Sequence, residues 1–282
     1  AYRHLLAEAN LRPRLHQLLD GLDAGDIDQL QRAGRAAREL LLSAPLPQDL
    51  EQSIVQAYRE LGYPAVAVRS TATAEDLPQA SFAGQQETYL NIEGEAALLE
   101  ACRRCYASLF SDRAISYRQL NGFNHVDVAL SIGVQRMVRS DLACSGVMFS
   151  IDTESGFREA VLLTAAYGLG ENVVQGAVNP DEYLIFKPTL QQGFAPIVSR
   201  RLGEKAIRMV YAEAGSTRNE DVDAAERMRY ALSDGEALQL ARWACQIEAH
   251  YSAQRGQPTP MDIEWAKDGS SGELFILQAR PE

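Results

Sequence analysis

The chain has 282 residues, of which 46% are hydrophobic, and it carries a formal net charge of -11. Such a composition is typical of an ordinary globular protein, and the acidic balance excludes a nucleic-acid partner because no basic stripe is available for phosphates. A small anionic ligand held by a few arginines stays compatible with it. No apolar run approaches the roughly 20 residues of a membrane span, and the opening AYRHLLAEAN is unlike a signal peptide.

Cysteine usage indicates a reducing, cytoplasmic environment, because a chain of this size needs no disulfide scaffold. Cys102 and Cys105 form a C-x-x-C pair, which is typical of zinc or redox sites. The surrounding EAALLEACRRCYASLF has helical periodicity and no second pair follows, so two buried thiols on a helix are favoured. The histidines, at 4, 16, 125 and 250, are too scattered to predict a metal cluster or a catalytic triad.

The first half of the chain changes character near Gly62. Apolar positions three and four apart predict successive helices over 2–61, punctuated by Pro13 and by the Ala-Pro-Leu-Pro at 44–47. After them we expect a strand at 65–69, a loop, a strand at 88–92, a helical stretch at 95–120 and a strand at 127–135. We assign residues 1–134 to a first lobe, with a helical segment at 1–62 and strands within 65–92.

The second half is rich in short strands, expected at 144–150, 160–164, 183–186, 197–201 and 206–210. The polar segment 213–226 is expected to be a mobile loop. Ser233 and Glu236 form a capping box that begins an amphipathic helix running to Tyr251. We assign 135–282 to a second lobe that ends in a hairpin at 258–282, which makes the chain α+β.

The C-terminal hairpin is predicted from two alternating stretches, 261–265 and 274–280, separated by turn chemistry at 268–272. If the turn centres on Ser270, each residue of the first strand pairs with the residue that lies the same number of positions after Ser270. Residues two apart on a strand share a face, so the two acidic residues of the first strand point the same way.

With that register, Asp262 lies opposite Gln278 and Glu264 lies opposite Ile276, diagonal to Gln278. Arg280 lies further along the same face. Oxygen ligands of this kind suit Mg²⁺, which takes one or two carboxylates together with phosphate oxygens. A solvent-facing polar stripe explains the same spacing, and the sequence alone leaves both interpretations open.

A second group of candidate residues follows the strand expected at 65–69. Arg69 at its end offers a bidentate fork to a phosphate, and backbone N–H groups near Gly84 can approach one closely because glycine has no Cβ. Thr88 adds a hydroxyl. A surface ion pair of Arg69 explains the same residue, and it is the commoner outcome.

A glycine-rich stretch at 166–171, AYGLGE, superficially resembles a dinucleotide-binding fingerprint. Val173 occupies the position of the third glycine, and no strand–helix–strand unit frames the stretch. We therefore expect a tight turn here, or a turn that closes over a ligand.

Together these pieces are more specific than any one of them. In order along nearly the whole chain, VRSTATAEDLPQASFAGQQETYLN, SLFSDRAISYR, VQRMV, SGVMFS, GLGENVVQGAVNPDEY, PMDIEW and LFILQARPE resemble the ATP-grasp domains of the phosphoenolpyruvate synthase (pyruvate, water dikinase) family. Pyruvate phosphate dikinase and rifampin phosphotransferase share that domain more distantly. The resemblance implies an ATP-grasp fold in which ATP lies between two lobes.

The resemblance also implies roles for residues of the first lobe and of the start of the second. Arg69 would bind the phosphates of ATP, and Gly84 and Thr88 would line the phosphate loop. Gln135 would hold the adenine side, with Met137 as an apolar wall. An arginine at a strand end is then explained by the negative charge of the nucleotide.

In the C-terminal hairpin the resemblance implies that Glu264 and Gln278 hold Mg²⁺, with Asp262 as a supporting ligand. Arg280 would pair with a phosphate. Positioning and cationic stabilisation carry most of the catalysis of phosphoryl transfer, so arginines and Mg²⁺ suffice without a side-chain nucleophile here.

The family's other parts have no counterpart in this sequence. Its acceptor histidine lies on a swivelling domain and its pyruvate site on a barrel domain, and neither motif is present. The family's Gly-Gly-Lys segment has no match within 1–62, so we expect an incomplete first lobe. The resemblance allows a homodimer of the intact enzyme.

The expected function is therefore transfer of a phosphoryl group from MgATP to a histidine on another domain, on the way to pyruvate. Two alternatives are a fragment that binds nucleotide without turnover and the ATP domain of a rifampin-type phosphotransferase.

Overall fold

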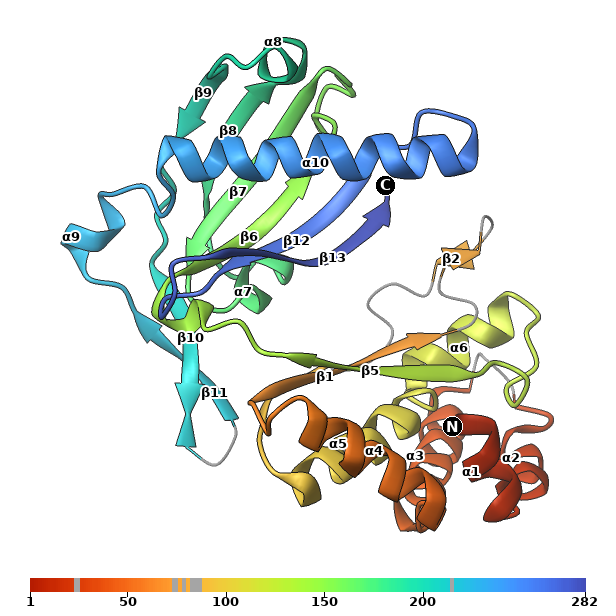
Figure 1. The fold of residues 1–282 in the computed structure, drawn as a ribbon. Coiled ribbons are helices and arrows are strands. Elements are labelled where there is room, and N and C mark those ends of the chain that lie inside the picture. Colours follow the sequence, from red (N-terminus) through yellow and green to blue (C-terminus); the bar gives the residue numbers. More distant parts are fainter. Residues whose placement is uncertain (23–25, 73–75, 78–79, 82–87, 214–215) are drawn as a thin grey trace. The chain divides into compact units, whose positions relative to one another are not determined.

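The structure is a computed structural model that describes residues 1–22, 26–72, 76–77, 80–81, 88–213 and 216–282 (Figure 1). The chain divides into two compact units, Ala1–Met137 and Val138–Glu282. Both combine helices with antiparallel sheets, so the predicted α+β class is confirmed. The expected lobe boundary between residues 134 and 135 falls inside strand β5 (Leu130–Arg136). None of the helices in the described ranges has the length and apolar character that a membrane crossing requires.

The helices of the first unit confirm the expectation of helix after helix over 2–61. They are α1 (Tyr2–Glu8), α2 (Leu11–Leu19), α3 (Ile27–Ser43) and α4 (Gln48–Glu60), followed later by α5 (Glu95–Ser108) and α6 (Asp112–Leu120). Pro13 does not separate two helices, because it lies in the first turn of α2, where its missing N–H would have no intrahelical acceptor. The single stretch expected at 95–120 is two helices, since the Ser111 side chain accepts a hydrogen bond from the Ala114 N–H and starts α6.

A three-stranded antiparallel sheet completes the first unit, in the order β4 (Thr88–Ile92), β1 (Val66–Ala72), β5. Two short strands, β2 (Asp76–Leu77) and β3 (Ala80–Ser81), pair with each other. Val66 and Val68 have no exposed surface and belong to the apolar core that includes Leu98 and Cys105 of α5. Because side chains alternate along a strand, Ala67 and Arg69 face away from those helices.

The C-x-x-C pair is confirmed as two buried thiols on a helix. Cys102 and Cys105 both lie on α5 and are almost completely buried. The Cys105 thiol contacts the carbonyl oxygen of Val68 at 3.7 Å. Burial raises the pKa of the Cys102 thiol to about 11, so this thiol is protonated and unreactive at neutral pH.

A six-stranded antiparallel sheet forms the centre of the second unit, and the five strands expected at 144–210 are present with shifted ends. Its order is β13 (Leu274–Pro281), β12 (Met261–Lys267), β6 (Cys144–Phe149), β7 (Ala160–Tyr167), β8 (Asp181–Phe186), β9 (Ile197–Arg201). The smaller elements are η1 (Ser140–Leu142), α7 (Glu171–Val174), α8 (Lys187–Gln191) and α9 (Ala224–Arg227).

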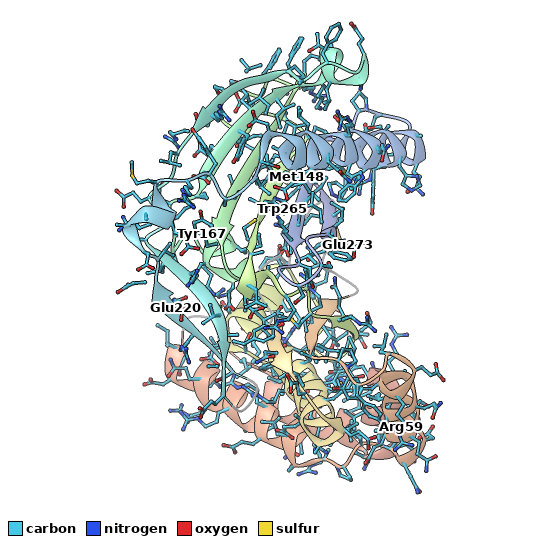
Figure 2. The ribbon with its side chains drawn as sticks, turned by 60° about the vertical axis from the view of Figure 1, so that its left-hand side comes forward. Arg59, Met148, Tyr167, Glu220, Trp265 and Glu273 are labelled. Atoms are coloured by element: carbon cyan, nitrogen blue, oxygen red, sulfur yellow. The ribbon has the colours of Figure 1, made fainter. Side chains whose placement is uncertain are left out.

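One long helix, α10 (Asp234–Arg255), lies across one face of this sheet (Figure 1). Its apolar residues Leu240 and Ala241 share a core with Ile263 of β12 and with Met148 and Trp265, which Figure 2 labels. The opposite face of β12 is therefore the one that carries its polar side chains.

The predicted capping box of α10 is present. The Ser233 hydroxyl accepts a hydrogen bond from the Glu236 N–H, and the Glu236 carboxylate accepts one from the Ser233 N–H. The helix ends at Arg255 rather than at the expected Tyr251, because its backbone stays helical beyond the end of the apolar pattern. Gly256, with a φ of 68°, supplies the left-handed end.

Ser233→Ala is expected to lower the free energy of unfolding by about 1 kcal/mol, the usual effect of losing an N-cap side chain. Ser233 is the better target of the two capping residues, since Glu236 also forms an ion pair with Lys267 at 2.6 Å. Urea denaturation followed by circular dichroism measures the change. A variant as stable as the wild type would show that the cap contributes nothing.

The expectation of a mobile loop at 213–226 is wrong. Strand β11 (Ser216–Asp221) pairs with β10 (Ile207–Ala212), and α9 follows. Arg208 pairs with Glu220 across the two strands, with 2.9 Å between guanidinium and carboxylate. The hairpin is held by such polar pairs, so β11 lacks the apolar alternation by which strands are recognised in a sequence.

Candidate functional site

Arg69 lies at the centre of the first unit's sheet. It is the fourth residue of β1, flanked by Thr88 of β4 and Gly133 of β5. Directly opposite residues share a face, so Arg69 and Thr88 are on the side turned away from the helices. A Cβ at Gly133 would lie in ordinary van der Waals contact with the arginine, 3.7 Å from Arg69 Cγ.

The expectation that Arg69 marks the end of its strand is wrong. The ladder between β1 and β5 continues three residues beyond it, to the pair Ala72 and Leu130. The run of hydroxyl residues after Arg69 had the composition of a loop. Threonine is nevertheless a good strand residue, and β5 supplies backbone partners for residues 70–72. The arginine is therefore held by strands on both sides.

Gln135 lies on the same face as Arg69, because it pairs with Ala67. Arg69 Nη1 donates a hydrogen bond to Gln135 Oε1 over 3.4 Å. Met137 is half-buried, and its N–H donates to the carbonyl of the residue before β1. The sequence-predicted residues Arg69, Thr88 and Gln135 thus share one sheet face, while Gly84 lies outside the described residues.

Glu264 and Gln278 are direct cross-strand neighbours in the hairpin of β12 and β13. Met261, Ile263 and Trp265 of β12 are buried, and Glu264 between them faces away from α10. A carboxylate and an amide oxygen are therefore side by side on the polar face of the second unit's sheet.

The register expected for this hairpin is wrong. Asp262 pairs with Arg280 and Glu264 with Gln278, rather than with Gln278 and Ile276. The turn lies between Lys267 and Leu274, and a bulge between Glu264 and Trp265 adds one residue to β13. Side-chain alternation gives the face of a residue but locates neither the centre of the turn, which lies between residues 270 and 271, nor a bulge. Each of the two displaces the partner by one position, two positions in all.

Asp262 and Arg280 form an ion pair. Arg280 Nε and Nη2 lie 2.8 Å and 2.7 Å from the same oxygen, Oδ2 of Asp262. Burial opposes the positive charge of Arg280, but the carboxylates of Asp262, Glu264 and Glu282 outweigh it and raise the pKa of the guanidinium. The hairpin face therefore combines acidic oxygens with one firmly protonated arginine.

This donor set fits a hard divalent cation that keeps other oxygen ligands. Glu264, Gln278 and Asp262 offer carboxylate and amide oxygens on one face, as Mg²⁺ prefers. Within the part of the chain that is described, no group of three or more His, Cys, Asp or Glu side chains could hold a metal alone. A cation here would need phosphate or water oxygens to complete its coordination.

The glycine-rich stretch at 166–171 connects the end of β7 to the start of α7 in the second unit. Gly168 follows β7 with a φ of 86°, and a Cβ there would lie 2.5 Å from the carbonyl oxygen of Met209. Gly170 then precedes the short helix α7. The close approach of two backbones explains the glycine.

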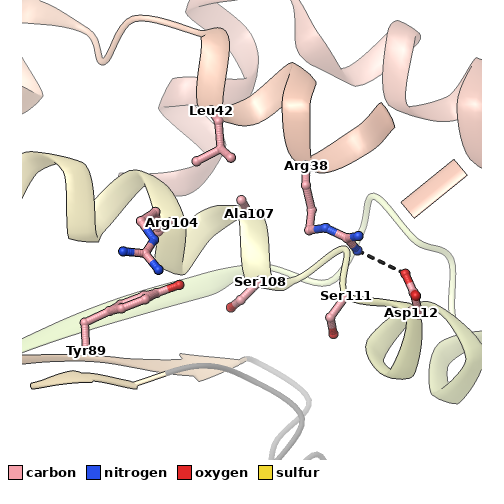
Figure 3. A pocket seen from close by; sticks show the side chains of 8 residues that line it. All are labelled: Arg38, Leu42, Tyr89, Arg104, Ala107, Ser108, Ser111 and Asp112. Carbon is pink, nitrogen blue, oxygen red and sulfur yellow. Dashed lines mark hydrogen bonds and ion pairs between the residues drawn. The ribbon is translucent and has the colours of Figure 1, made fainter. Parts of the chain in front are cut away.

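A cavity of about 360 Å³ lies on the other side of the first unit's sheet, the side of the helices (Figure 3). Nothing in the sequence pointed to it. Arg104 lies 4.3 Å from the centre of the Tyr89 ring, and Arg38 pairs with Asp112 at 3.1 Å. Tyr89 pairs with Val68 and so faces away from Arg69. We assign this cavity no part in the site.

Two separate clusters are thus defined, an arginine–glutamine–threonine face on one unit and an acidic hairpin with a paired arginine on the other. The profile of the family described as pyruvate phosphate dikinase, AMP/ATP-binding domain, matches residues 1–282. The chain belongs to this family.

Individual relatives give a more specific comparison than the family profile. Over its whole length the chain is 62% identical to the phosphoenolpyruvate synthase of Synechocystis sp., 54% identical to that of Helicobacter pylori and 53% identical to that of Escherichia coli. It spans 36% of the length of each of these proteins. The resemblance inferred from the sequence motifs is confirmed.

Proposed function

We propose that this chain is the ATP-binding domain of a phosphoenolpyruvate synthase and transfers a phosphoryl group from MgATP to a histidine on a separate domain. The intact enzyme converts ATP, pyruvate and water to phosphoenolpyruvate, AMP and phosphate. The observation that carries the proposal is the pairing of Glu264 with Gln278 beside Asp262 and Arg280, in a chain that matches the AMP/ATP-binding family throughout.

The second unit would bind the metal end of the nucleotide. Glu264 and Gln278 would hold Mg²⁺, with Asp262 in support, and the cation would neutralise phosphate charge. Arg280 would contact a phosphate; its raised pKa keeps it charged at every physiological pH. The ion pair with Asp262 places the guanidinium on the same sheet face as Glu264 and Gln278.

The first unit would bind the rest of the nucleotide. Arg69 would contact phosphates, and Gln135, which accepts its hydrogen bond, fixes the direction of the guanidinium and would hold the adenine side. Thr88 and Gly84 would line the phosphate loop, and Met137 would supply an apolar wall. We propose the ATP-grasp arrangement for the two units on this basis.

Binding and turnover are tested separately. Isothermal titration is expected to show binding of ATP with Mg²⁺ and much weaker binding in excess EDTA. Addition of the histidine-bearing domain of the same enzyme is expected to release AMP. Binding without AMP release would favour a module that holds nucleotide without turnover. AMP release that depends on rifampin instead of pyruvate in the intact protein would favour an antibiotic phosphotransferase.

Arg69→Ala is expected to weaken MgATP binding roughly tenfold to a hundredfold, the effect of losing charge-assisted hydrogen bonds to phosphate. Arg136→Ala is the matched control. Arg136 is on the same sheet, but it pairs with Val66 and its guanidinium donates to the carbonyl of Leu61, on the other face.

The alternative role of Arg69, a structural ion pair, gives the opposite result. The melting temperature of Arg69→Ala would then fall by several degrees while MgATP affinity stays at the wild-type value. Differential scanning calorimetry on Arg69→Ala and Arg136→Ala, alongside the titrations, distinguishes the two outcomes.

A further inference from the structure

The sheet of the first unit holds the chain up to Met137, the last residue of that unit. The backbone N–H of Met137 donates a hydrogen bond to the carbonyl of Ala65 over 2.9 Å. This bond extends the ladder between β1 and β5 one position past the pair of Val66 with Arg136. The backbone of Met137 is therefore part of the first sheet.

Two residues later the chain is held again, by the turn of the hairpin of β12 and β13. The Arg139 N–H donates to Asp268 Oδ2 over 3.1 Å, and the Arg139 carbonyl accepts from the Gly269 N–H over 3.0 Å. The Arg139 guanidinium pairs with Asp141 at 2.8 Å and lies 4.9 Å from the centre of the Tyr211 ring. Both backbone polar groups of Arg139 are thus bound to the loop between β12 and β13.

Asp268 has two distinct roles in this arrangement. Its Oδ1 accepts hydrogen bonds from the N–H groups of Ser270 and Ser271 and so shapes the turn, while Oδ2 accepts from Arg139. Partial burial opposes ionisation of Asp268, but these N–H groups together outweigh it and lower the pKa of the carboxyl. The carboxylate is ionised at neutral pH and both of its oxygens are used.

Gly269 brings the turn against the linker. A Cβ at this position would lie 2.5 Å from Leu142 Cβ and 2.7 Å from the Leu142 carbonyl oxygen, closer than real Cβ atoms come. Only glycine lets the turn approach the segment after Arg139 closely enough for the Gly269 N–H to reach the Arg139 carbonyl. A larger residue at position 269 would therefore disrupt the contact between the hairpin turn and the linker.

We propose that Asp268 is a positioning residue: it ties the hairpin of Glu264 and Gln278 to Arg139 and leaves Val138 as the single pivot between the units. The role in catalysis rests on the proposed function, because it assumes that those two side chains hold Mg²⁺. The ladder of β12 with β6 joins Glu264 to the start of the second unit, and the contact of Asp268 extends that connection back to Arg139. Without that tie, only local backbone bonds would hold the linker at Arg139, from the Ser140 N–H to the Val138 carbonyl and from the Leu142 N–H to the Arg139 carbonyl.

Three single variants isolate the contact. Asp268→Asn keeps an oxygen for Ser270 and Ser271 but places an amide NH₂ against the Arg139 N–H, so the turn stays and the tie is lost. Gly269→Ala separates the loops sterically. Ser271→Ala is the matched control, because its hydroxyl accepts from the Glu273 N–H within the same turn and does not contact Arg139.

The tie is measured first as a distribution of distances. Spin labels at Glu51→Cys on α4 and Gln254→Cys on α10, both exposed positions, are introduced into the 282-residue chain with Cys245 replaced by serine. Pulsed electron paramagnetic resonance then reports the spread of distances between the units. We expect Asp268→Asn and Gly269→Ala to broaden this spread and Ser271→Ala to leave it unchanged.

MgATP affinity is the second readout. The two tie variants are expected to bind MgATP between about threefold and tenfold more weakly, the size of effect common for residues that act through others. The melting temperature is expected to change little in Asp268→Asn and to fall in Gly269→Ala, because the added Cβ forces the Leu142 backbone to shift. An unchanged distance spread in both, or equal broadening in Ser271→Ala, would overturn the inference. Failure of the wild type to bind MgATP would overturn the proposed function alone, since the distance comparison needs no nucleotide.

Discussion

Glu264→Ala is expected to weaken MgATP binding on the order of a hundredfold, about 2.7 kcal/mol, with little change in thermal stability. The side chain lies on the polar face of β12, directly opposite Gln278, and contributes nothing to the apolar core beneath Ile263 and Trp265. Removing it takes a carboxylate from the proposed Mg²⁺ site and leaves the sheet intact. Isothermal titration at saturating Mg²⁺ measures the loss.

Glu273→Ala is the control for Glu264→Ala. Glu273 is an exposed acidic residue of the same hairpin, next to the turn, and removing it changes the net charge equally. Its MgATP affinity is expected to match that of the wild type. Equal weakening in both variants would mean that general electrostatics, and not metal coordination, governs binding, and wild-type affinity in Glu264→Ala would remove Glu264 from the site.

Lys205→Met is expected to lower the free energy of unfolding by about 3–5 kcal/mol, because it leaves a buried carboxylate without its cation. Lys205 and Asp181 are both completely buried, with 2.5 Å between Nζ and Oδ1. Asp181 also accepts hydrogen bonds from the N–H groups of Gly203 and Ala231. The carboxylate thus holds together three segments of the second unit.

Arg200→Ala provides the comparison for this buried pair. Arg200 pairs with Asp234 at 2.6 Å, but about half of each side chain is exposed, 47% and 56%. Loss of such a surface pair is expected to cost less than about 1 kcal/mol. Chemical denaturation monitored by tryptophan fluorescence compares the two variants. Similar losses would show that burial does not determine the strength of these pairs.

Much of the fold followed from periodicity and local chemistry. The α10 capping box and the buried thiols of α5 depend on residues within one or two helical turns, and a sequence displays such spacings directly. Strand β11 was missed because cross-strand polar pairs such as Arg208 with Glu220 stabilise it, and those pairs are invisible before the partner strand is known.

The sequence predicts which sheet face each candidate residue of the hairpin occupies, but not its cross-strand partner. Alternation placed Asp262 and Glu264 together, whereas the partner of each depended on the exact turn centre and on a bulge, which no local pattern indicates. The roles proposed for these residues came from the resemblance to the family. Arg139 and Asp268 were not found, because the contact joins residues 129 positions apart.

The bulge in the hairpin has a consequence for which insertions and deletions the second unit can accept. Ile276 and Ala279 both pack toward the core although three positions separate them, and Leu277 is the extra residue that makes this possible. Deleting Leu277 would remove the bulge and leave an uninterrupted ladder, in which Gln278 still pairs with Glu264, Arg280 still pairs with Asp262 and Ala279 still faces the core. Loss of one codon at this point would therefore straighten the strand and spare the chemistry of its polar face.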